Sequence, residues 1–431
     1  MHYKLIIIFI SMSFLSGQSL FNRWIGSDPF TGSARSTSMG HTHLLNSTGS
    51  TNVRFNPANL IKGNSSLIID MQMDRFSIFE RWSMPMRDSF GEFLTNADYV
   101  ANEFSQFGLR GGLSVSINIL KLGEIGLGLH TAPLSHFTYH YLEEVRGSNQ
   151  IEDGEYASKD PIIGYHNLKS SGLLQVSSLG AGVGINFFNL LNLSIGMSLN
   201  QIHESLISDI VEIDTLYSDV TNLSTFPDIH QESKLSKSNF IIMSAQCKLN
   251  SNIIIASSWE ESTIVNSNNY NWTINSTNGL FQYWDDGNYA INGLNYLKPE
   301  IFSFGVTYIS NQQGKISINF ELNQISYHNH LNLNDYKSFK FGFEYITIMG
   351  TPIRGGLTYK TPMISSLEPL SMFTFGTGKT IENLILDLAG TYSLQSFKYP
   401  DLFLVEGDVR TDYDLVRDSQ LNLSLSLTYQ F

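Results

Sequence analysis

Hydrophobic and polar residues alternate strictly at the carboxyl end of the chain. Successive side chains of a β-strand point to opposite faces, so this pattern gives one apolar face and one polar face. The same alternation recurs at 113–119, 191–199, 302–308, 316–322 and 339–345. The apolar positions of the last stretch are Leu421, Leu423, Leu425, Leu427, Tyr429 and Phe431. The pattern predicts a chain built largely from strands.

Two architectures produce such alternation, a soluble sandwich with a dry core and a transmembrane barrel that is apolar outside. The length of the runs separates them. Many runs hold about 9–12 residues, the length that a tilted strand needs to cross the hydrocarbon layer. Strands of soluble proteins average about 5–6 residues. The run lengths therefore favour the barrel.

The connections between the runs support the same choice. We predict fourteen strands, which start near Leu67, Leu113, Gly126, Leu173, Leu191, Phe240, Ile253, Ile301, Lys315, Phe339, Ile353, Leu370, Leu384 and Leu421. Joins after even-numbered strands are short, for example Phe188–Leu190 and the Gly378–Thr380 turn. Nearly all the long joins follow odd-numbered strands: Ser83–Gly108, Gly147–Gly172, Leu206–Asn239, Ser262–Pro299 and Ser396–Ser419. An outer-membrane barrel with both termini in the periplasm has this arrangement, and an even strand count lets it close. The predicted fold is all-β, a transmembrane antiparallel β-barrel.

Composition excludes several other classes of protein. The 431 residues carry 26 basic and 39 acidic side chains, a net charge of −13, which argues against a nucleic-acid partner. No apolar run of about 18 residues is present, so a helical membrane protein is excluded. The single cysteine, Cys247, excludes a disulfide framework and a cysteine-based zinc site. With no Ser-His-Asp or paired-carboxylate arrangement evident, we expect no enzyme activity, cofactor or bound metal.

The first 17 residues have the layout of a secretory signal peptide. Lys4 precedes the apolar run 5–10, and small residues follow up to Ser16 and Gly17. The alternative is a buried strand, which is less typical directly after the initiator methionine. We therefore expect an exported protein.

A segment rich in Gly, Ser and Asn separates this peptide from the first strand. It contains Gly-Ser-Ala-Arg-Ser-Thr-Ser-Met-Gly at 32–40 and Asn-Pro-Ala-Asn-Leu at 56–60. Both motifs, and the spacing from Met39 to Asn56, resemble the amino-terminal segment of the FadL-like outer-membrane transporters and the related PorV-type barrels. Departures from that pattern are His41 and Asn59, which replace glycines, and Thr48-Gly49, which stands where an acidic pair is usual.

The resemblance extends into the barrel. Residues 340–345 with 352–359, and 373–378 with 386–389, resemble two hairpins of the family. The resemblance implies a barrel of about 14 strands with an amino-terminal plug, or hatch, in its lumen. It also implies gating by Met39, Gly40, Asn56, Pro57 and Ala58. The implied domains are a signal peptide at 1–17, a plug at 18–63 and a barrel with long extracellular loops at 64–431.

Two functions follow from the resemblance. The first is passive outer-membrane transport of hydrophobic solutes such as long-chain fatty acids or hydrocarbons. The alternative is a PorV-like partner protein in protein secretion or surface attachment, without solute transport. The expected partners are outer-membrane lipid, a hydrophobic small-molecule ligand and the barrel-assembly machinery, with secretion-system proteins under the alternative.

Physical arguments also predict that this segment fills the lumen. An unplugged lumen of fourteen strands would leak water and small solutes, and a polar segment can bond to a polar lumen wall. Proline at 57 pushes Asn56 toward extended geometry. A plug without any moving part remains an alternative to a gate.

Candidate ligand-binding residues follow from strand phase. With apolar residues facing lipid, Lys340, Arg354 and Lys360 face the lumen and could bind a carboxylate-bearing ligand. The alternative is internal pairing with Glu321, Glu344 or Asp387, which point the same way.

Three further features have weaker interpretations. Trp272, Phe281 and Trp284, in the aromatic loop 266–296, could capture a hydrophobic solute or pack the loop itself. The glycines of 180–184 make room for the plug rather than a phosphate loop. The terminal Tyr429 and Phe431 resemble the carboxyl-terminal assembly signal of bacterial outer-membrane barrels.

Overall fold

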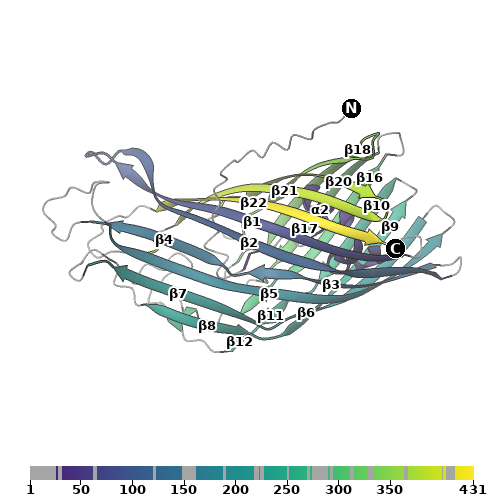
Figure 1. Ribbon diagram of the computed structural model, residues 1–431, viewed down its shortest axis with the longest axis horizontal. Coiled ribbons are helices and arrows are strands. Elements are labelled where there is room, and N and C mark those ends of the chain that lie inside the picture. Colours follow the sequence, from purple (N-terminus) through teal and green to yellow (C-terminus); the bar gives the residue numbers. More distant parts are fainter. Residues whose placement is uncertain are drawn as a thin grey trace.

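The computed structural model has the form of an elongated barrel of antiparallel strands (Figure 1). It describes residues 26–27, 32–61, 66–119, 123–147, 162–187, 191–217, 223, 228–249, 252–268, 272–273, 290–291, 295–310, 315–328, 333–363, 367–399, 401–403 and 413–431. The predicted signal peptide lies outside the described residues. No helix in the described ranges is long and apolar enough to cross a membrane.

Fourteen strands form a closed antiparallel ring, which confirms the predicted fold and strand number. The ring closes where β22 pairs with β1, in register from Ile68 with Gln430 to Ser83 with Leu415. The barrel strands are β1 (Ser66–Arg87), β2 (Phe93–Ile119), β3 (Gly123–His136), β5 (Ile162–Phe187), β6 (Leu191–Ile202), β9 (Ser238–Leu249), β10 (Ile253–Glu260), β16 (Glu300–Ile309), β17 (Ile316–Ser326), β18 (Tyr336–Ile346), β19 (Pro352–Lys360), β20 (Leu370–Ile381), β21 (Leu384–Tyr399) and β22 (Asp414–Gln430).

The two faces of the barrel have opposite chemistry, as the alternation predicts. On β1, Ile69 and Met71 point outward and are 47% and 51% exposed, whereas Gln72 and Asp74 point inward and are buried. The remaining barrel strands repeat this arrangement, with apolar side chains outside and Ser, Thr, Asn and charged side chains inside. An apolar exterior is what the hydrocarbon of a membrane requires.

Several strands continue into segments that were predicted to be long loops. β1 extends to Arg87, β2 begins at Phe93, and β22 begins at Asp414. The join between β20 and β21 is at Glu382–Asn383, so the prediction of a Gly378–Thr380 turn was wrong. Further strands lie outside the ring: β4 (Tyr139–Arg146), β7 (Ser205–Thr215), β8 (Ile229–Leu235), β11 (Thr263–Val265), β12 (Ser267–Asn268), β13 (Trp272–Thr273), β14 (Ala290–Ile291) and β15 (Tyr296–Lys298). β4 and β7 pair with the outer half of β5 and lengthen the barrel wall there.

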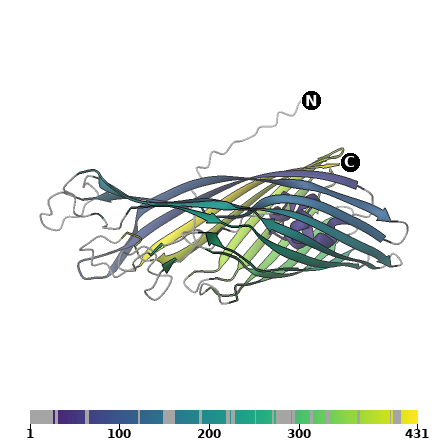
Figure 2. The ribbon, with the colours of Figure 1, turned by 90° about the horizontal axis from the view of Figure 1, so that it is seen from below.

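Among the described residues, five short helices lie inside the barrel, near the end that holds the carboxyl terminus (Figure 2). They are α2 (Ala34–Ser38), α3 (His43–Asn46), η1 (Gly49–Thr51), α4 (Asn52–Phe55) and η2 (Pro57–Leu60). We call residues 32–61 the plug. Most of its side chains are buried against the strands.

Candidate functional site

The Met-Gly motif of the plug contacts the barrel wall through its backbone. Gly40 N–H donates to Thr374 Oγ1 at 2.8 Å, and Thr358 Oγ1 donates to the Gly40 carbonyl at 2.8 Å. This contact requires glycines in the wall: a Cβ at Gly356 would lie 2.2 Å from Gly40 N, and one at Gly342 would lie 2.4 Å from Met39 O. The predicted hatch residues Met39 and Gly40 are therefore fixed to β18, β19 and β20.

His41, which replaces a glycine of the family pattern, has a backbone conformation that explains why the replacement is tolerated. It has φ of +56°, in the left-handed region, and Gly40 before it has φ of +67°. Glycine adopts this region without strain, and histidine is one of the residues that tolerate it. The backbone at position 41 thus has a geometry that suits the glycine of the family pattern, and the histidine of this chain tolerates it.

The Asn-Pro-Ala motif forms a second backbone contact with the wall. The Asn56 side chain donates to the Leu44 carbonyl and to Gln246 Oε1, each at 2.9 Å, and Ala58 N–H donates to Ser244 Oγ at 2.8 Å. Asn56 has φ of −151°, the extended value that the following proline favours. The sequence did not indicate that its side chain would join α3 to β9.

Glycines again allow the close approach. Gly126, Gly182 and Gly196 are direct cross-strand neighbours on β3, β5 and β6. A Cβ at Gly182 would lie 2.4 Å from Pro57 O, and one at Gly196 would lie 2.3 Å from Ala58 N. The glycines of 180–184 thus make room for the plug, as predicted from the sequence.

Charged pairs also join the plug to the wall. Arg35 binds Glu344 at 2.7 Å, Arg54 binds Glu260 at 3.0 Å, and Leu44 N–H donates to Glu321 at 3.0 Å. Ser50 donates from both N–H and Oγ to Asp70 of β1, at 2.6 and 2.7 Å. The plug is therefore held on several sides of the lumen.

The three cations proposed as ligand-binding residues point inward, but they do not form one site. Lys340 binds Glu321 at 2.7 Å, and Arg354 binds Glu344 and Asp387, each at 2.6 Å. This is the internal pairing that was the alternative to ligand binding. Lys340 and Lys360 line a cavity of about 120 Å³, here called the plug cavity. Arg354 instead lines a cavity of about 260 Å³ near the turn that holds Gly350. Their role in ligand binding stays a prediction.

A third cavity, of about 100 Å³, lies beside the plug cavity and is here called the side cavity. Its apolar lining comes from β3, β15 and β16 and from the residues around β17 and β18: Leu134, Tyr296, Pro299, Ile301, Tyr327 and Tyr336. Arg54, Glu260, Ile301 and Tyr336 line both cavities, so the two share a wall.

The side cavity adjoins an edge of β3. Pairing of β2 with β3 ends at Gly111 with Thr131, whereas β3 continues to His136 and pairs with β5 on its other side. Pro133 lies at a register shift in that pairing. Ser27 lies at this edge, and its N–H donates to the His136 carbonyl at 2.7 Å. The barrel wall therefore has an incomplete pairing beside an apolar cavity.

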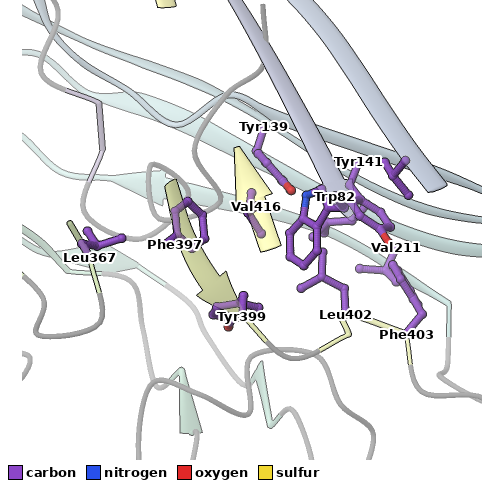
Figure 3. Packing of buried hydrophobic residues seen from close by; sticks show 12 residues of the cluster. Trp82, Tyr139, Tyr141, Val211, Leu367, Phe397, Tyr399, Leu402, Phe403 and Val416 are labelled. Carbon is purple, nitrogen blue, oxygen red and sulfur yellow. The ribbon is translucent and has the colours of Figure 1, made fainter. Parts of the chain in front are cut away.

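The outer half of the barrel holds a densely packed cluster of apolar and aromatic side chains. Trp82, Tyr139, Tyr141 and Phe403 are among its fully buried members, and their side chains converge in Figure 3. Phe403 stacks on Tyr141 with ring centroids 5.8 Å apart. A second buried cluster around Leu134 and Tyr296 continues to the side cavity. Two buried apolar clusters thus lie in the outer half of the barrel and beside the side cavity, with charged side chains such as Glu80 bonded to members of the first.

The remaining predicted residues have separate positions. Phe281 and Trp284 lie outside the described residues, and Trp272 belongs to β13, which pairs with β14. Tyr429 and Phe431 are 41% and 65% exposed, with ring centroids 4.7 Å apart, and Phe431 N–H donates to the Leu67 carbonyl. Capture by the outer loop and assembly through the terminal aromatics stay predictions.

Sequence reasoning missed the residues of the shared wall between the two cavities. Arg54 and Lys298 both bind Glu260 Oε1, at 3.0 and 3.1 Å. The alternating pattern of β10 could have predicted that Glu260 points inward, because Ala256, Ser258 and Glu260 lie on the same face of that strand. Nothing in the sequence indicated which plug residue meets it across 206 positions.

Solved structures with the same arrangement exist. A FadL homologue of Pseudomonas aeruginosa is 13% identical, with a TM-score of 0.54, over 94% of this chain and 99% of that one. The chain has the FadL-like fold. The toluene transporter TodX of Pseudomonas putida is 14% identical over 93% of this chain and 98% of its own, with a TM-score of 0.51. The toluene transporter TbuX of Ralstonia pickettii is 12% identical over 94% and 99%, with a TM-score of 0.50. At these identities the FadL-like likeness establishes the fold alone. No protein-family model matches the sequence, and the search of curated proteins finds no match.

Proposed function

We propose that the protein is an outer-membrane passive transporter for hydrophobic solutes such as long-chain fatty acids or hydrocarbons. The observation that carries the proposal is the side cavity, which lies between a buried apolar cluster and an incompletely paired edge of the barrel wall. Burial of apolar surface favours a solute there by about 0.8 kcal/mol for each CH₂ group. The FadL-like fold, which named toluene transporters share, supports the same function.

The proposed route has three steps. A solute enters between the outer strands, where the aromatic loop of 266–296 is the predicted place of first capture. It moves past the buried apolar clusters of the outer half, which must shift to let it pass, to the side cavity. It then leaves by the free edge of β3, sideways into the membrane, or past the plug. Either path bypasses the polar surface layer of the outer membrane, which is the main barrier for an apolar solute.

The outer membrane as location rests on several features together. They are the closed ring, its apolar exterior, and the predicted signal peptide at residues 1–17. Barrels that close in this way are typical of that membrane. Assembly machinery and outer-membrane lipid are accordingly the proposed partners.

A substitution that fills the cavities tests the proposal. Ile301 lines both cavities, whereas the next residue, Phe302, points outward and is 51% exposed. We expect I301W to remove co-purifying apolar molecules, detected by native mass spectrometry, and to slow the uptake of a fluorescent fatty acid by cells that carry the protein. F302W is the matched control and should behave as the unsubstituted protein.

Two results would overturn the proposal. One is a purified barrel without any apolar adduct whose loss from cells leaves hydrophobic uptake unchanged. The other is a co-purifying polypeptide in place of a small molecule, which would favour the PorV-like role in secretion or surface attachment.

A further inference from the structure

Two buried carboxyl groups face each other on the inner surface of the barrel, where the ring closes. Glu80 of β1 and Asp418 of β22 are direct cross-strand neighbours. They are 0% and 1% exposed. We call Glu80 and Asp418 the carboxyl pair. Like charges in directly opposed, buried positions are destabilising, so we do not expect both groups to be ionised together.

The carboxyl pair lies beyond the lipid-facing band of the barrel. On β22, the residues of 421–429 that point outward are apolar. Further along the same outer face, Arg417 is the cross-strand neighbour of Arg81, and both approach Asp98, at 3.9 and 2.8 Å. Charged side chains on the exterior mark the end of the apolar band. The pair at this level is therefore outside the membrane-spanning part of the strands.

The two members of the carboxyl pair have unequal surroundings. Glu80 Oε1 accepts hydrogen bonds from Trp82 Nε1 at 2.7 Å and from the Tyr139 hydroxyl at 2.8 Å. Asp418 Oδ2 accepts one long bond from Gln420 Nε2 at 3.4 Å, and its Oδ1 is buried without a hydrogen-bond partner among the described residues. Donated hydrogen bonds stabilise the ionised form of a carboxyl group. The negative charge therefore belongs to Glu80, and Asp418 keeps its proton.

The groups around Asp418 leave Glu80 as the charge that acts on it. Its neighbour on β21, Gln395, is uncharged, and so is Asn102 of β2, which donates to Glu80 at 3.3 Å. The flanking inward residues of β22, at 416 and 420, are uncharged as well. Burial, followed by the charge of Glu80, raises the pKa of Asp418 well above its ordinary value of 3.8, and the bond from Gln420 acts against this shift.

The carboxyl pair supports the packed aromatic cluster of the outer half. Trp82 and Tyr139, which donate to Glu80, are members of this cluster (Figure 3). Phe403 completes it from the connection between β21 and β22, and stacks on His166 with ring centroids 4.8 Å apart. Residues 401–403, here called the inserted segment, belong to no strand. Such a segment opens at lower cost than the continuous pairing of β1 with β22.

We propose that the carboxyl pair is a pH-sensitive switch that closes the outer end of the barrel. With a proton on Asp418, the aromatic cluster stays packed. When Asp418 releases this proton to water, two negative charges oppose each other, and the inserted segment leaves the cluster so that water can solvate both carboxylates. The inference goes beyond the proposed function, because it concerns access to the lumen whatever solute is carried.

The direction of the pH effect follows from the raised pKa. Above its ordinary pKa, Asp418 is ionised in the open or unfolded chain but protonated in the closed form. The closed form thus binds the additional proton, and it loses stability as the pH rises through the pKa of Asp418 in that form. D418N cannot ionise and should stay closed over the whole range.

Infrared spectra test whether Asp418 is protonated. We expect a carbonyl band of a buried carboxylic acid at about pH 5.5, where ordinary aspartates are ionised. The band should be absent from D418N and retained in D98N, which changes an aspartate on the exterior. In E80Q the opposing charge is gone, so the band should disappear at a lower pH than in the unsubstituted protein.

The reactivity of a cysteine in the inserted segment tests the opening. In a C247S background, L402C replaces a fully buried side chain, and L216C replaces an exposed one and corrects for the ionisation of the thiol. The rate of L402C with a membrane-impermeant maleimide, divided by that of L216C, should rise about tenfold between about pH 5.5 and about pH 8.5, the effect of about 1.4 kcal/mol. The rise should be absent when D418N or E80Q is added.

Two results would overturn the switch. One is an acid band that D418N leaves unchanged, which would show that Asp418 is ionised. The other is an equal rise in L402C reactivity with and without D418N and E80Q, in barrels whose folding is established by heat-modifiable migration in gels. Neither measurement involves solute uptake, so the proposed transport function stands or fails separately.

Discussion

At the scale of single residues, glycines of the wall decide where the plug is fixed. Gly356 faces the plug, and a Cβ there would lie 2.2 Å from Gly40 N, whereas the nearest atom to a Cβ at Gly355 would be Thr374 O, at 3.7 Å. Two adjacent positions on one strand therefore differ in whether a side chain can be added. On the plug side, these close contacts are made by the backbone of the Met-Gly and Asn-Pro-Ala motifs.

This difference gives a matched pair of substitutions. G356V should displace Ser38–Gly40 from the wall, at a cost of about 1–3 kcal/mol for the overlap, and should loosen the plug. G355V should leave it in place. Conductance across planar bilayers measures the outcome: a rise with G356V alone is expected, and equal conductance in both variants would contradict the role of Gly356.

At the scale of elements, the backbone hydrogen bonds of the barrel do not depend on the plug. Every strand of the ring pairs with another barrel strand. Three of the carboxylates that accept from the plug also have a cation outside it: Glu344 has Arg354, Glu321 has Lys340, and Glu260 has Lys298. The barrel therefore keeps its own charge pairs when the plug is absent.

Deletion of residues 32–60 should thus give a folded but open barrel. We expect heat-modifiable migration in gels to persist, because the ring closes without the plug, and conductance to rise strongly, because the lumen is no longer filled. A variant that fails to fold would show that the plug is required as a template for the barrel. A folded variant with unchanged conductance would contradict the plug's role as the barrier.

The elements also show how far the sequence predicts the structure. Residues inside the membrane must alternate, because one face meets lipid and the other the lumen, and all fourteen strands were found from this pattern. Outside the membrane, no such constraint applies, so β7 and β8 were taken for part of a loop. The meeting of Arg54, Glu260 and Lys298 was not predictable, since it depends on the three-dimensional path of the plug.

At the scale of the whole molecule, exposed apolar side chains are of two kinds. Ile195 lies on the barrel exterior and is 66% exposed, and Leu216 follows β7 in the outer extension and is 51% exposed. On the proposed membrane arrangement, the first meets lipid and the second meets water. A similar exposed fraction therefore corresponds to lipid contact at Ile195 and to water contact at Leu216.

Substitution by arginine should separate the two surroundings. I195R should lower the free energy of unfolding in phospholipid vesicles by about 2–4 kcal/mol if the residue lies near the bilayer midplane. L216R should change it by less than about 0.5 kcal/mol. Equilibrium denaturation of the refolded protein measures both values, and equal effects would contradict the assigned membrane position.

The closure of β22 on β1 brings together the two ends of the barrel sequence. The Asn-Pro-Ala contact of the plug rests on β5 and β6, in the first half of the ring, whereas the Met-Gly contact rests on β18, β19 and β20, in the second half. The plug therefore connects strands that are distant in sequence, and it ties the two halves of the ring together from the inside.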